Sequence, residues 1–287
     1  MKETDFAYAA GYIDGDGCFQ IGKKWDSHLT ISSVSKPSIM WFAESFDGHL
    51  RCHRRNDGIR RPAFYFRFSE KGLKFLPKIH PYLVEKEEES SVFQRFREFV
   101  GKSAKTHVVE EMKRLKHEAN LINQSIKSEV EEIRNIIKPC IEDFAYLAGF
   151  VDAECSIDIN RRMQTKGKTF TYRPQLQCNN TPAPFFYWSS QRFGGQFHFL
   201  DKSHIPRCRN QMLWRISNAQ LDPILEGIYP FLKTKKEICE QLMELRKSTH
   251  SKKRISPNHP QFMEIYRPIA ERREAIYHKV RHLNKIT

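Results

Sequence analysis

The sequence lacks several features that define whole classes of proteins. It has no run of about 18 consecutive apolar residues, so neither a membrane-spanning helix nor a membrane partner is expected. None of its seven cysteines belongs to a Cys-x-x-Cys pair or to a paired Cys and His spacing, which argues against a zinc site. The cysteines are odd in number and scattered, at positions 18, 52, 140, 155, 178, 208 and 239, so we expect reduced thiols and an intracellular protein.

A targeting segment is also lacking. A helix rich in small residues is predicted to begin within a few residues of Met1, which leaves no room for a signal or transit peptide. We therefore expect a location inside the cell, in a bacterial cytoplasm or in an organelle. The sequence does not distinguish these two compartments.

Acidic residues are fewer than basic ones. The 287 residues carry 48 Lys and Arg against 34 Asp and Glu, a formal net charge of +14 at pH 7, so a polyanionic partner is expected. Charge alone does not establish nucleic-acid binding, because a soluble basic protein has the same composition. With 39% apolar residues, the chain can form one large domain or two medium ones, each with its own core.

The chain contains an internal repeat of twelve positions. Residues 6–17, FAYAAGYIDGDG, return without a gap as residues 144–155, FAYLAGFVDAEC, a displacement of 138 positions. An acid is expected to end each motif helix, Asp16 in the first copy and Glu154 in the second. Small residues recur at i, i+4 and i+8, which places them on one helix face and lets two helix axes approach closely. They are Ala7, Gly11 and Gly15 in the first copy and Ala145, Gly149 and Ala153 in the second.

Both copies resemble the LAGLIDADG motif, and two of them in one chain are similar to the monomeric LAGLIDADG homing endonucleases. The first copy is the closer match, since Cys155 stands where the family usually has its closing glycine. The resemblance covers nearly the whole chain. No protein-splicing domain accompanies it, so we expect a free-standing, intron-encoded product.

The pattern after each motif predicts the order α-β-β-α-β-β-α. This is an α+β fold of two pseudo-symmetric halves, each a four-stranded antiparallel sheet backed by helices, packed through the two motif helices. We assign residues 1–124 to the N half, 125–142 to a linker and 143–287 to the C half. The elements expected in the N half are a strand after Gly17, Leu29–Val34, a strand with Leu50 and Cys52 facing inward, Phe64–Ser69, and helices at Ile39–Phe46, Glu70–Ile79 and Pro81–Phe99.

Two acids at one tip can share divalent cations. Hard oxygen ligands suit Mg²⁺, which binds through one or two carboxylates and substrate phosphate. The resemblance implies that Asp16 and Glu154 bind the metal, with the carbonyls of Gly15 and Ala153 as further ligands. Such a site hydrolyses phosphodiester bonds by activating water and stabilising the leaving oxygen.

A plain turn or a calcium loop is the alternative reading of residues 14–17. The calcium-loop pattern fails, because Cys18 and Phe19 stand where it needs an oxygen ligand and a glycine. The plain turn is disfavoured because a second acid occurs at the same place in the repeat. Asp14 and Asp152 are interpreted as structural residues that cap or orient the helix ends.

Four further residues are candidates for catalysis. Lys86 and Lys235 match the family's lysine position after Pro-aromatic-Leu, and they recur in both halves. A lysine there could steady the charge that develops in the transition state, although a solvated lysine at a helix start is the alternative. Lys36 and Asn180 fall where the family often carries a polar residue that positions the water network.

The outward faces of the predicted strands are polar and basic. A twisted antiparallel ribbon can enter the major groove of DNA, and in the family the two sheets form a saddle over a long duplex site. The halves carry different outward residues, so an asymmetric site is expected. The candidate base or phosphate contacts are Gln20, Lys24, Arg51, His53, Arg55, Arg67, Asn160, Arg162, Gln175, Gln177, His198, Lys202 and Arg215.

The sequence therefore predicts a monomeric, Mg²⁺-dependent endonuclease that cuts both strands of DNA at a specific site. Two alternatives use the same fold. One is a maturase whose partner is intron RNA, and the other is a DNA-binding regulator without catalytic activity. Cleavage of duplex DNA separates the enzyme from both.

Overall fold

The computed structural model describes residues 1–21, 26–53, 61–98, 106–114, 137–163, 170–180, 184–200, 211–249 and 262–286. The N half contains α1 (Glu3–Asp16), β1 (Gly17–Ile21), β2 (Ser27–Ser33), α2 (Lys36–Ser45), β3 (Gly48–His53), β4 (Ala63–Phe68), a 3-10 turn (Gly72–Phe75), α3 (Leu76–Ile79), a second 3-10 turn (His80–Tyr82), α4 (Glu87–Glu98) and a helix at residues 106–114. The C half contains α6 (Ile141–Glu154), β5 (Cys155–Met163), β6 (Phe170–Asn180), α7 (Pro184–Phe193), β7 (Gln196–Leu200), β8 (Gln211–Ser217), a 3-10 turn (Asn218–Gln220), α8 (Leu221–Ile228), α9 (Lys236–Thr249) and α10 (Phe262–Ile286).

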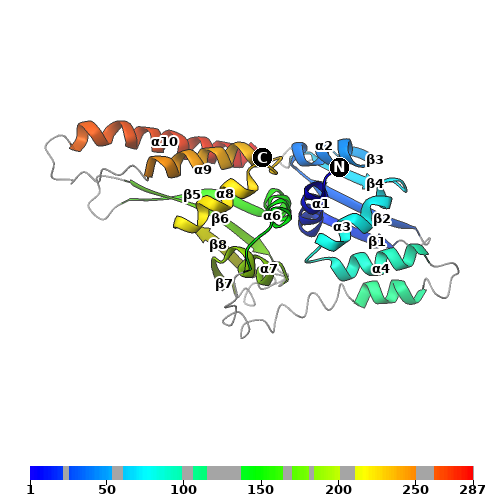
Figure 1. Cartoon of the computed structure of the whole chain (residues 1–287). Coiled ribbons are helices and arrows are strands. Elements are labelled where there is room, and N and C mark those ends of the chain that lie inside the picture. The colour runs from blue at the N-terminus through cyan, green and yellow to red at the C-terminus, as the bar shows by residue number, and fades with distance from the viewer. Residues whose placement is uncertain are drawn as a thin grey trace.

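Each half holds one four-stranded antiparallel sheet. The strand orders, β1-β2-β4-β3 and β5-β6-β8-β7, are the same. Corresponding residues also pair alike: Gly17 lies opposite Ile31 in the first sheet, and Cys155 lies opposite Cys178 in the second. The predicted α+β class and the two-fold repeat are confirmed (Figure 1).

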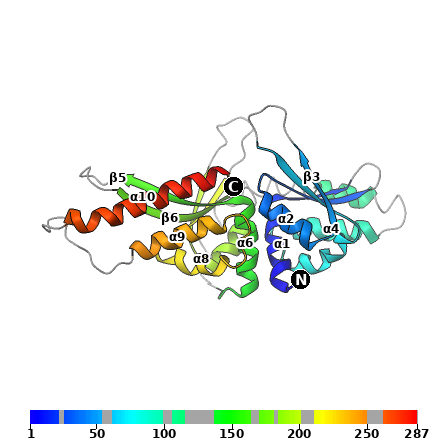
Figure 2. The same ribbon diagram turned by 90° about the horizontal axis from the view of Figure 1, so that it is seen from above.

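The two halves meet through α1 and α6, which lie side by side at the middle of the molecule (Figure 2). Gly11 and Gly149 permit this contact. A Cβ added at Gly11 would lie 2.0 Å from the Tyr146 carbonyl oxygen, and one added at Gly149 would lie 2.1 Å from the Tyr8 carbonyl oxygen. The small-residue face predicted from the repeat is therefore the surface that joins the halves.

One face of each sheet packs on helices and the other is polar. In the N half Phe19, Ile31 and Phe66 are fully buried, while their neighbours Gln20 and Arg67 are exposed. The alternation follows from the period of two along a strand. It leaves the polar faces of both sheets available for a ligand.

The edge strand β3 departs from the prediction. Leu50 was expected to face the core, but it is 41% exposed, and Cys52 is exposed as well. The order β1-β2-β4-β3 puts β3 at the end of the sheet. An edge strand has a neighbour on one side only, so the alternating pattern did not guarantee burial there.

The segment between β4 and α4 also differs from the prediction. A single helix was expected over Glu70–Ile79, but this segment contains a 3-10 turn and then the four-residue helix α3. The next helix begins at Glu87 rather than Pro81. The amides of Val84, Glu85 and Lys86 donate hydrogen bonds to the Asp14 carboxylate, so these residues are not helical.

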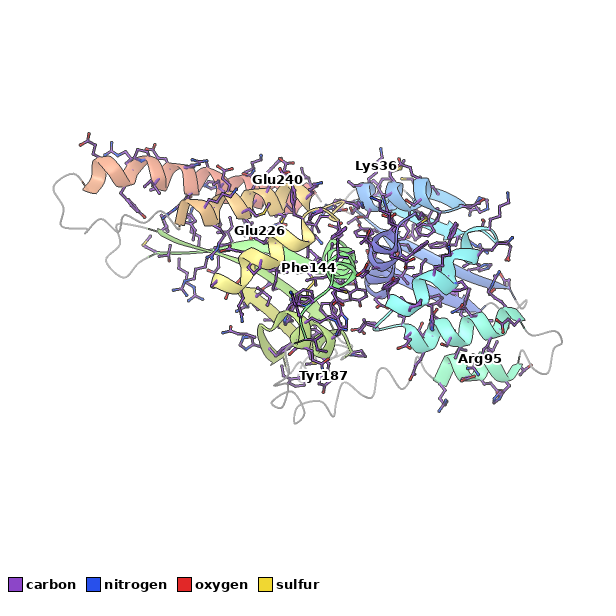
Figure 3. The ribbon with its side chains drawn as sticks, viewed as in Figure 1. Lys36, Arg95, Phe144, Tyr187, Glu226 and Glu240 are labelled. Carbon is purple, nitrogen blue, oxygen red and sulfur yellow. A yellow bond between two sulfur atoms is a disulfide. The ribbon has the colours of Figure 1, made fainter. Side chains whose placement is uncertain are left out.

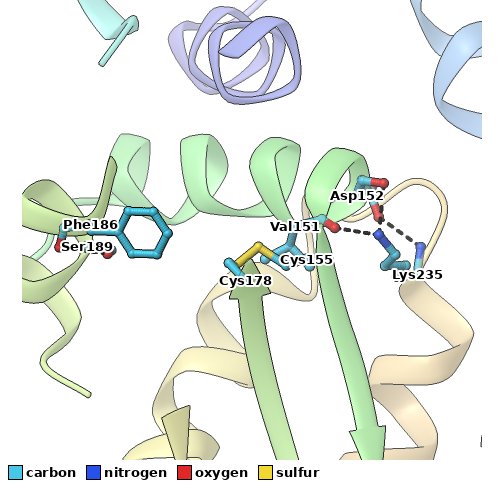
Figure 4. Close-up of a disulfide and its surroundings, with 7 residues drawn as sticks. All are labelled: Val151, Asp152, Cys155, Cys178, Phe186, Ser189 and Lys235. Atoms are coloured by element: carbon cyan, nitrogen blue, oxygen red, sulfur yellow. Dashed lines mark hydrogen bonds between the residues drawn. A yellow bond between two sulfur atoms is a disulfide. The ribbon is translucent and has the colours of Figure 1, made fainter. Parts of the chain in front are cut away.

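Cys155 and Cys178 form a disulfide between β5 and β6 (Figure 4). The prediction that all cysteines are reduced is therefore wrong for this pair. The reason is tertiary, because the strand register brings two residues 23 positions apart in sequence directly opposite each other. Cys18, Cys52, Cys140 and Cys239 are free thiols.

Most of the predicted linker, residues 125–142, lies outside the described residues, and the domain boundaries stay a prediction. Where the chain is described again, the Ile137 amide donates to the Gln191 carbonyl of α7 at 2.7 Å. No described helix is long and apolar enough to cross a membrane.

Candidate functional site

The two acids of the repeat lie at the adjoining ends of α1 and α6. Asp16 is the last residue of α1, and Glu154 is the last residue of α6. A Cβ added at Gly15 would lie 2.5 Å from the Cβ of Ala153 and 3.0 Å from the Cγ of Glu154, so the helix ends touch. The predicted juxtaposition of Asp16 and Glu154 is present.

Burial and mutual repulsion act on these carboxyl groups. Desolvation, with the negative charge of Glu154 as the next cause, raises the pKa of Asp16 to about 7, while Lys235 acts against the shift. Glu154 is at the exposed rim of the site, yet partial desolvation raises the pKa of its carboxyl as well. Two acids held together in this way favour binding of a positive ion between them.

Lys86 and Lys235 each donate hydrogen bonds to carbonyl groups at one helix end. The Lys86 amine lies 2.8 Å from the Ile13 oxygen, also contacts the Asp14 oxygen, and is 3.5 Å from the Gly15 oxygen. The Lys235 amine lies 2.6 Å from the Val151 oxygen and 2.9 Å from the Asp152 oxygen (Figure 4). Cations at the carboxyl ends of helices are favourably placed, and these two also stand beside the acid pair.

Desolvation lowers the pKa of Lys235, and the negative charges of Asp152, Asp16 and Glu154 oppose this shift. The two lysines were predicted from their position in the repeat. The structure brings both to the helix ends that carry Asp16 and Glu154. The alternative, that each is a solvated lysine at a helix start, does not fit the contacts of either lysine.

Asp14 and Asp152 anchor the loops that carry the two lysines. The Asp14 carboxylate accepts the amides of Val84, Glu85 and Lys86 at 2.7, 3.1 and 2.9 Å. Asp152 accepts the amides of three consecutive residues, 233–235, at 2.7, 3.1 and 2.9 Å. Three amide donors favour the charged form of a carboxylate, whereas burial raises the pKa of Asp14.

Two tyrosines connect the halves in a reciprocal manner. The Tyr8 hydroxyl of α1 donates to Asp152 of α6 at 2.9 Å, and the Tyr146 hydroxyl of α6 donates to Asp14 of α1 at 2.7 Å. Burial raises the pKa of both hydroxyl groups. These roles were not predicted from the sequence, although the repeat aligns Tyr8 with Tyr146 and supplied the signal.

Lys36 and Asn180, the predicted water-positioning pair, do not occupy corresponding places. Lys36 is exposed at the start of α2 (Figure 3), whereas Asn180 ends β6. The strand register makes Ser33 the counterpart of Asn180, since Ser33 pairs with Phe64 and Asn180 pairs with Met212. A hydrogen bond from Ser33 lowers the pKa of Asp16 against the effect of burial, so Ser33 is the polar neighbour of the acid in the N half.

The polar face of the N-half sheet is hollowed. The hollow has a volume of about 1190 Å³, and three predicted contact residues, Arg51, His53 and Arg67, line it. Arg67 contacts His28, which lies 2.5 Å from Asp26. Asp26 and His28 were missed because they lie beside the start of β2, where no alternation marks a face. The hydrogen bond from His28 lowers the pKa of Asp26.

The polar face of the C-half sheet presents a different set of side chains. Arg215 donates to the Gln177 amide oxygen at 3.4 Å, as does the Gln175 side chain. Asn160 and His198 also belong to strands of this sheet.

The remaining predicted contact residues are divided between the halves. Gln20 lies on β1 of the N half and Arg162 on β5 of the C half. Lys24, Arg55 and Lys202 lie outside the described residues, as does the side chain of Asn180.

The described residues contain no group of three or more His, Cys, Asp or Glu side chains that could hold a metal ion. A metal at the acid pair would therefore take two carboxylates and complete its ligands with carbonyls, water or a substrate. That donor set is hard and incomplete. It suits Mg²⁺ with a phosphate substrate better than a structural zinc.

No protein-family model and no curated protein sequence matches the chain. Solved structures do match over almost its whole length. A mutant of I-SmaMI has a TM-score of 0.64 and 15% identity, covering 96% of this chain and 98% of that one. The LAGLIDADG homing endonuclease I-GzeII, in complex with its DNA target, has a TM-score of 0.60 and 16% identity, with coverages of 94% and 97%.

A third structure, the LAGLIDADG meganuclease I-AabMI bound to uncleaved DNA, has a TM-score of 0.55 and 18% identity and covers 93% of this chain and 98% of that one. At such identities the similarity establishes the fold. The duplicated motif, the equal strand orders and the joined helix ends agree with it. The chain therefore has the two-domain LAGLIDADG fold of these homing endonucleases, with one motif helix in each half.

Proposed function

We propose that this protein is a site-specific endonuclease that hydrolyses both strands of duplex DNA. The observation that carries the proposal is the position of the acid pair. Asp16 and Glu154 meet where the two halves join, between two sheets whose polar faces carry arginine, histidine and amide side chains. The DNA complexes of I-GzeII and I-AabMI support the same partner.

Mg²⁺ is the proposed cofactor. Asp16 and Glu154 would hold it, together with the carbonyls of Gly15 and Ala153. When bound, the ion would supply an activated water and stabilise the charge on the leaving oxygen. The fit is supported by the raised pKa of Asp16, which reflects burial beside a second negative charge that a divalent cation would relieve. The I-SmaMI complex with uncleaved DNA in the presence of calcium ions supports use of a divalent metal.

Lys86 and Lys235 would contribute fixed positive charge. Their amines are held by helix-end carbonyls, so the charge is in place before a phosphate arrives. A preorganised cation costs no reorganisation during the reaction and stabilises the negative charge that develops at phosphorus. Asp14 and Asp152 act through the loops that they anchor and are positioning residues. Asn180, with Ser33 as its counterpart, and Lys36 are proposed to position water.

The target would be asymmetric. Arg67 and Arg215 occupy corresponding strand positions, but Arg67 stands beside Thr30 and contacts His28, whereas Arg215 stands beside Gln177. Two halves with different side chains cannot prefer a palindrome. We further propose that the protein acts as a monomer inside the cell, in a bacterial cytoplasm or an organelle, and that it is intron-encoded.

The proposal is tested by selecting cleaved duplexes from a genomic or random DNA library with Mg²⁺. An Asp16→Asn, Glu154→Gln double variant runs beside the wild type. A single long, asymmetric site cut by the wild type alone supports the endonuclease. Tight binding by both proteins without cleavage indicates the regulator, and binding of intron RNA without DNA cleavage indicates the maturase.

A further inference from the structure

The C-terminal helix α10 packs against strands β5 and β6 of the C-half sheet. Strand β5 is an edge strand, and the Asn284 side chain donates to the Ile157 carbonyl on it at 3.0 Å. Arg161 of β5 pairs with Glu274 and lies 5.0 Å from the centre of the Tyr277 ring. Figure 2 shows α10 running beside β5 from the outer end of the C half to the middle of the molecule.

One side of α10 packs on α9. Ile276, Val280 and Leu283 are buried, and Lys279 pairs with Glu237 of α9 at 3.0 Å. At 100° per residue, the opposite side of the helix carries a different group. We call this group the α10 basic face, and it consists of His278, Arg281, His282 and Lys285, all of which are exposed.

The α10 basic face points away from α9, which packs on the other side of α10. Together with Arg161 and Tyr277, it lines a hollow of about 360 Å³ beside the end of β5. Arg161 lies on the same side of β5 as the buried Ile157 and Ile159, so the hollow is at the edge of the C-half sheet and outside its polar face.

Most of the charge of this face is not neutralised. His278 lies 3.0 Å from Glu274, but among the described residues no acid pairs with Arg281, His282 or Lys285. On the packed side, by contrast, Arg272 and Lys279 pair with glutamates of α9. Helix surfaces with cations on one side and compensated charge on the other suit a polyanion. Apart from His278, cations that pair with acids and cations that do not therefore lie on different sides of one helix of 25 residues.

The carboxyl end of α10 lies near the end of α6 that carries Glu154. Asn284, at the carboxyl end of α10, lines a second hollow of about 340 Å³ together with Ala153 and Lys235. Lys285, the next residue after Asn284, is therefore the member of the α10 basic face nearest to this hollow, and the other three members follow along the helix away from it. In the N half, the helix that follows α4 is described only over residues 106–114, and α10 has no counterpart of its length among the described residues.

We propose that the α10 basic face binds the sugar-phosphate backbone of the duplex DNA target, outside the contacts made by the sheets and on the C-half side of the cleavage point. The inference rests on the proposed endonuclease function and names a further part of its DNA-binding surface. The contact is to phosphate, so it adds affinity without base preference. It also makes the footprint longer on one side.

The test compares two double variants of the full chain. Arg281→Ala, Lys285→Ala removes two charges from the α10 basic face. Lys113→Ala, Lys247→Ala removes two exposed charges from the helix at 106–114 and from α9, and serves as the matched control. Binding to a long random-sequence duplex is measured over a salt series, and circular dichroism checks that both variants fold.

Two lost phosphate contacts should reduce the slope of log affinity against log salt by about 1.8, at about 0.9 for each phosphate, while the control keeps the wild-type slope. Equal slopes for wild type and the Arg281, Lys285 variant would overturn the inference, as would an equal reduction in the control. A loss confined to structured RNA would also overturn it, since the face would then serve another polyanion.

Failure of the proposed function has a different signature. If the wild type neither binds nor cuts duplex DNA, the endonuclease proposal fails and this inference falls with it. If the wild type binds and cuts DNA but the Arg281, Lys285 variant behaves identically, only the inference fails. On a cleaved target, hydroxyl-radical footprinting should show protection lost on the C-half flank alone.

Discussion

The two halves share one framework and differ in what they attach to it. Asp14 with Lys86 and Asp152 with Lys235 repeat the same set of contacts at nearly the same distances. The differences lie next to this framework. The framework that aligns the acids is therefore duplicated, whereas the residues that surround it have diverged.

Three differences stand out. The pair Gly17 and Ile31 in the N half corresponds to the disulfide Cys155–Cys178 in the C half. The residue before the lysine is Glu85 in the N half and Thr234 in the C half. Its environment differs too, because Glu85 accepts the Phe185 amide at 2.9 Å, whereas Thr234 bonds with Ser38 at 2.6 Å.

The largest expected effect concerns the two acids, one from each half. Asp16→Asn and Glu154→Gln, made separately, should each reduce DNA cleavage about a thousandfold or more, equivalent to about 4 kcal/mol, because stabilisation of transition-state charge at a shared metal requires both carboxylates. The measurement is single-turnover cleavage of the selected target. Exposed acids in each half, Glu44→Gln and Glu226→Gln, are the controls and should cut normally.

If only one of the two acid variants lost activity, the halves would not be equivalent in catalysis. Glu154 differs from Asp16 in its longer side chain and its more exposed position, so a difference between the two variants is expected to come from Glu154. Full activity of both variants would remove the acid pair from the mechanism.

The second effect tests the shared helix contact. Gly11→Ala and Gly149→Ala should each reduce the free energy of unfolding by about 3 kcal/mol, the upper end for overpacking, because the new methyl group meets a backbone carbonyl of the other helix. Urea unfolding of the two variants measures the loss. Helix propensity alone predicts the opposite sign, since alanine favours a helix by about 1 kcal/mol over glycine. A gain in stability at either position would show that the helices do not approach as described.

The third effect concerns the Cys155–Cys178 disulfide, which only the C half can form at this place, because the corresponding pair in the N half is Gly17 and Ile31. Cys178→Ser should lower the free energy of unfolding by about 2 kcal/mol under oxidising conditions, the low end of the range for a native disulfide. A reducing agent should abolish the difference from the wild type. Cys52→Ser, an exposed free thiol in the other half, is the matched control and should have no effect under either condition. A redox-independent difference at Cys178 would assign the loss to packing instead.

The sequence predicted the framework because the framework is repeated. The motif placed α1 and α6, ended them at Asp16 and Glu154, and aligned Lys86 with Lys235. Each of these inferences needed only local pattern and the second copy. The resemblance then supplied the fold, which the structural comparisons confirm.

What the sequence did not predict depends on partners brought together by folding. The hydroxyl contacts of Tyr8 and Tyr146 cross from one half to the other. Lys36 was predicted as the counterpart of Asn180, but strand register, which no local pattern fixes, selects Ser33. The disulfide is likewise a consequence of register between β5 and β6.

The smallest effect returns to the difference between Glu85 and Thr234. Glu85 is largely buried, and desolvation followed by the charge of Asp14 raises its pKa from 4.5 to about 8, with Glu154 adding to the shift and Lys86 opposing it. Its Oε2 atom has no hydrogen-bond partner among the described residues. A carboxyl whose pKa is raised by folding binds its proton more tightly in the folded state.

The sign of the pH dependence follows from that difference. Above 4.5 the unfolded chain releases this proton while the folded protein keeps it, so the contribution of Glu85 to stability falls as pH rises, and the loss is complete above about 8. In metal-free buffer, Glu85→Gln should therefore gain stability over the wild type between these limits. The gain should reach about 1.4 kcal/mol or more at the upper limit, the free energy of one pH unit. Glutamine keeps an oxygen to accept the Phe185 amide, so the contact between the halves is retained. Thr234→Val in the C half, where no carboxyl titrates, should shift stability equally at both limits. A constant difference between Glu85→Gln and the wild type across this range would contradict the raised pKa of Glu85. It would also remove this difference between the two halves.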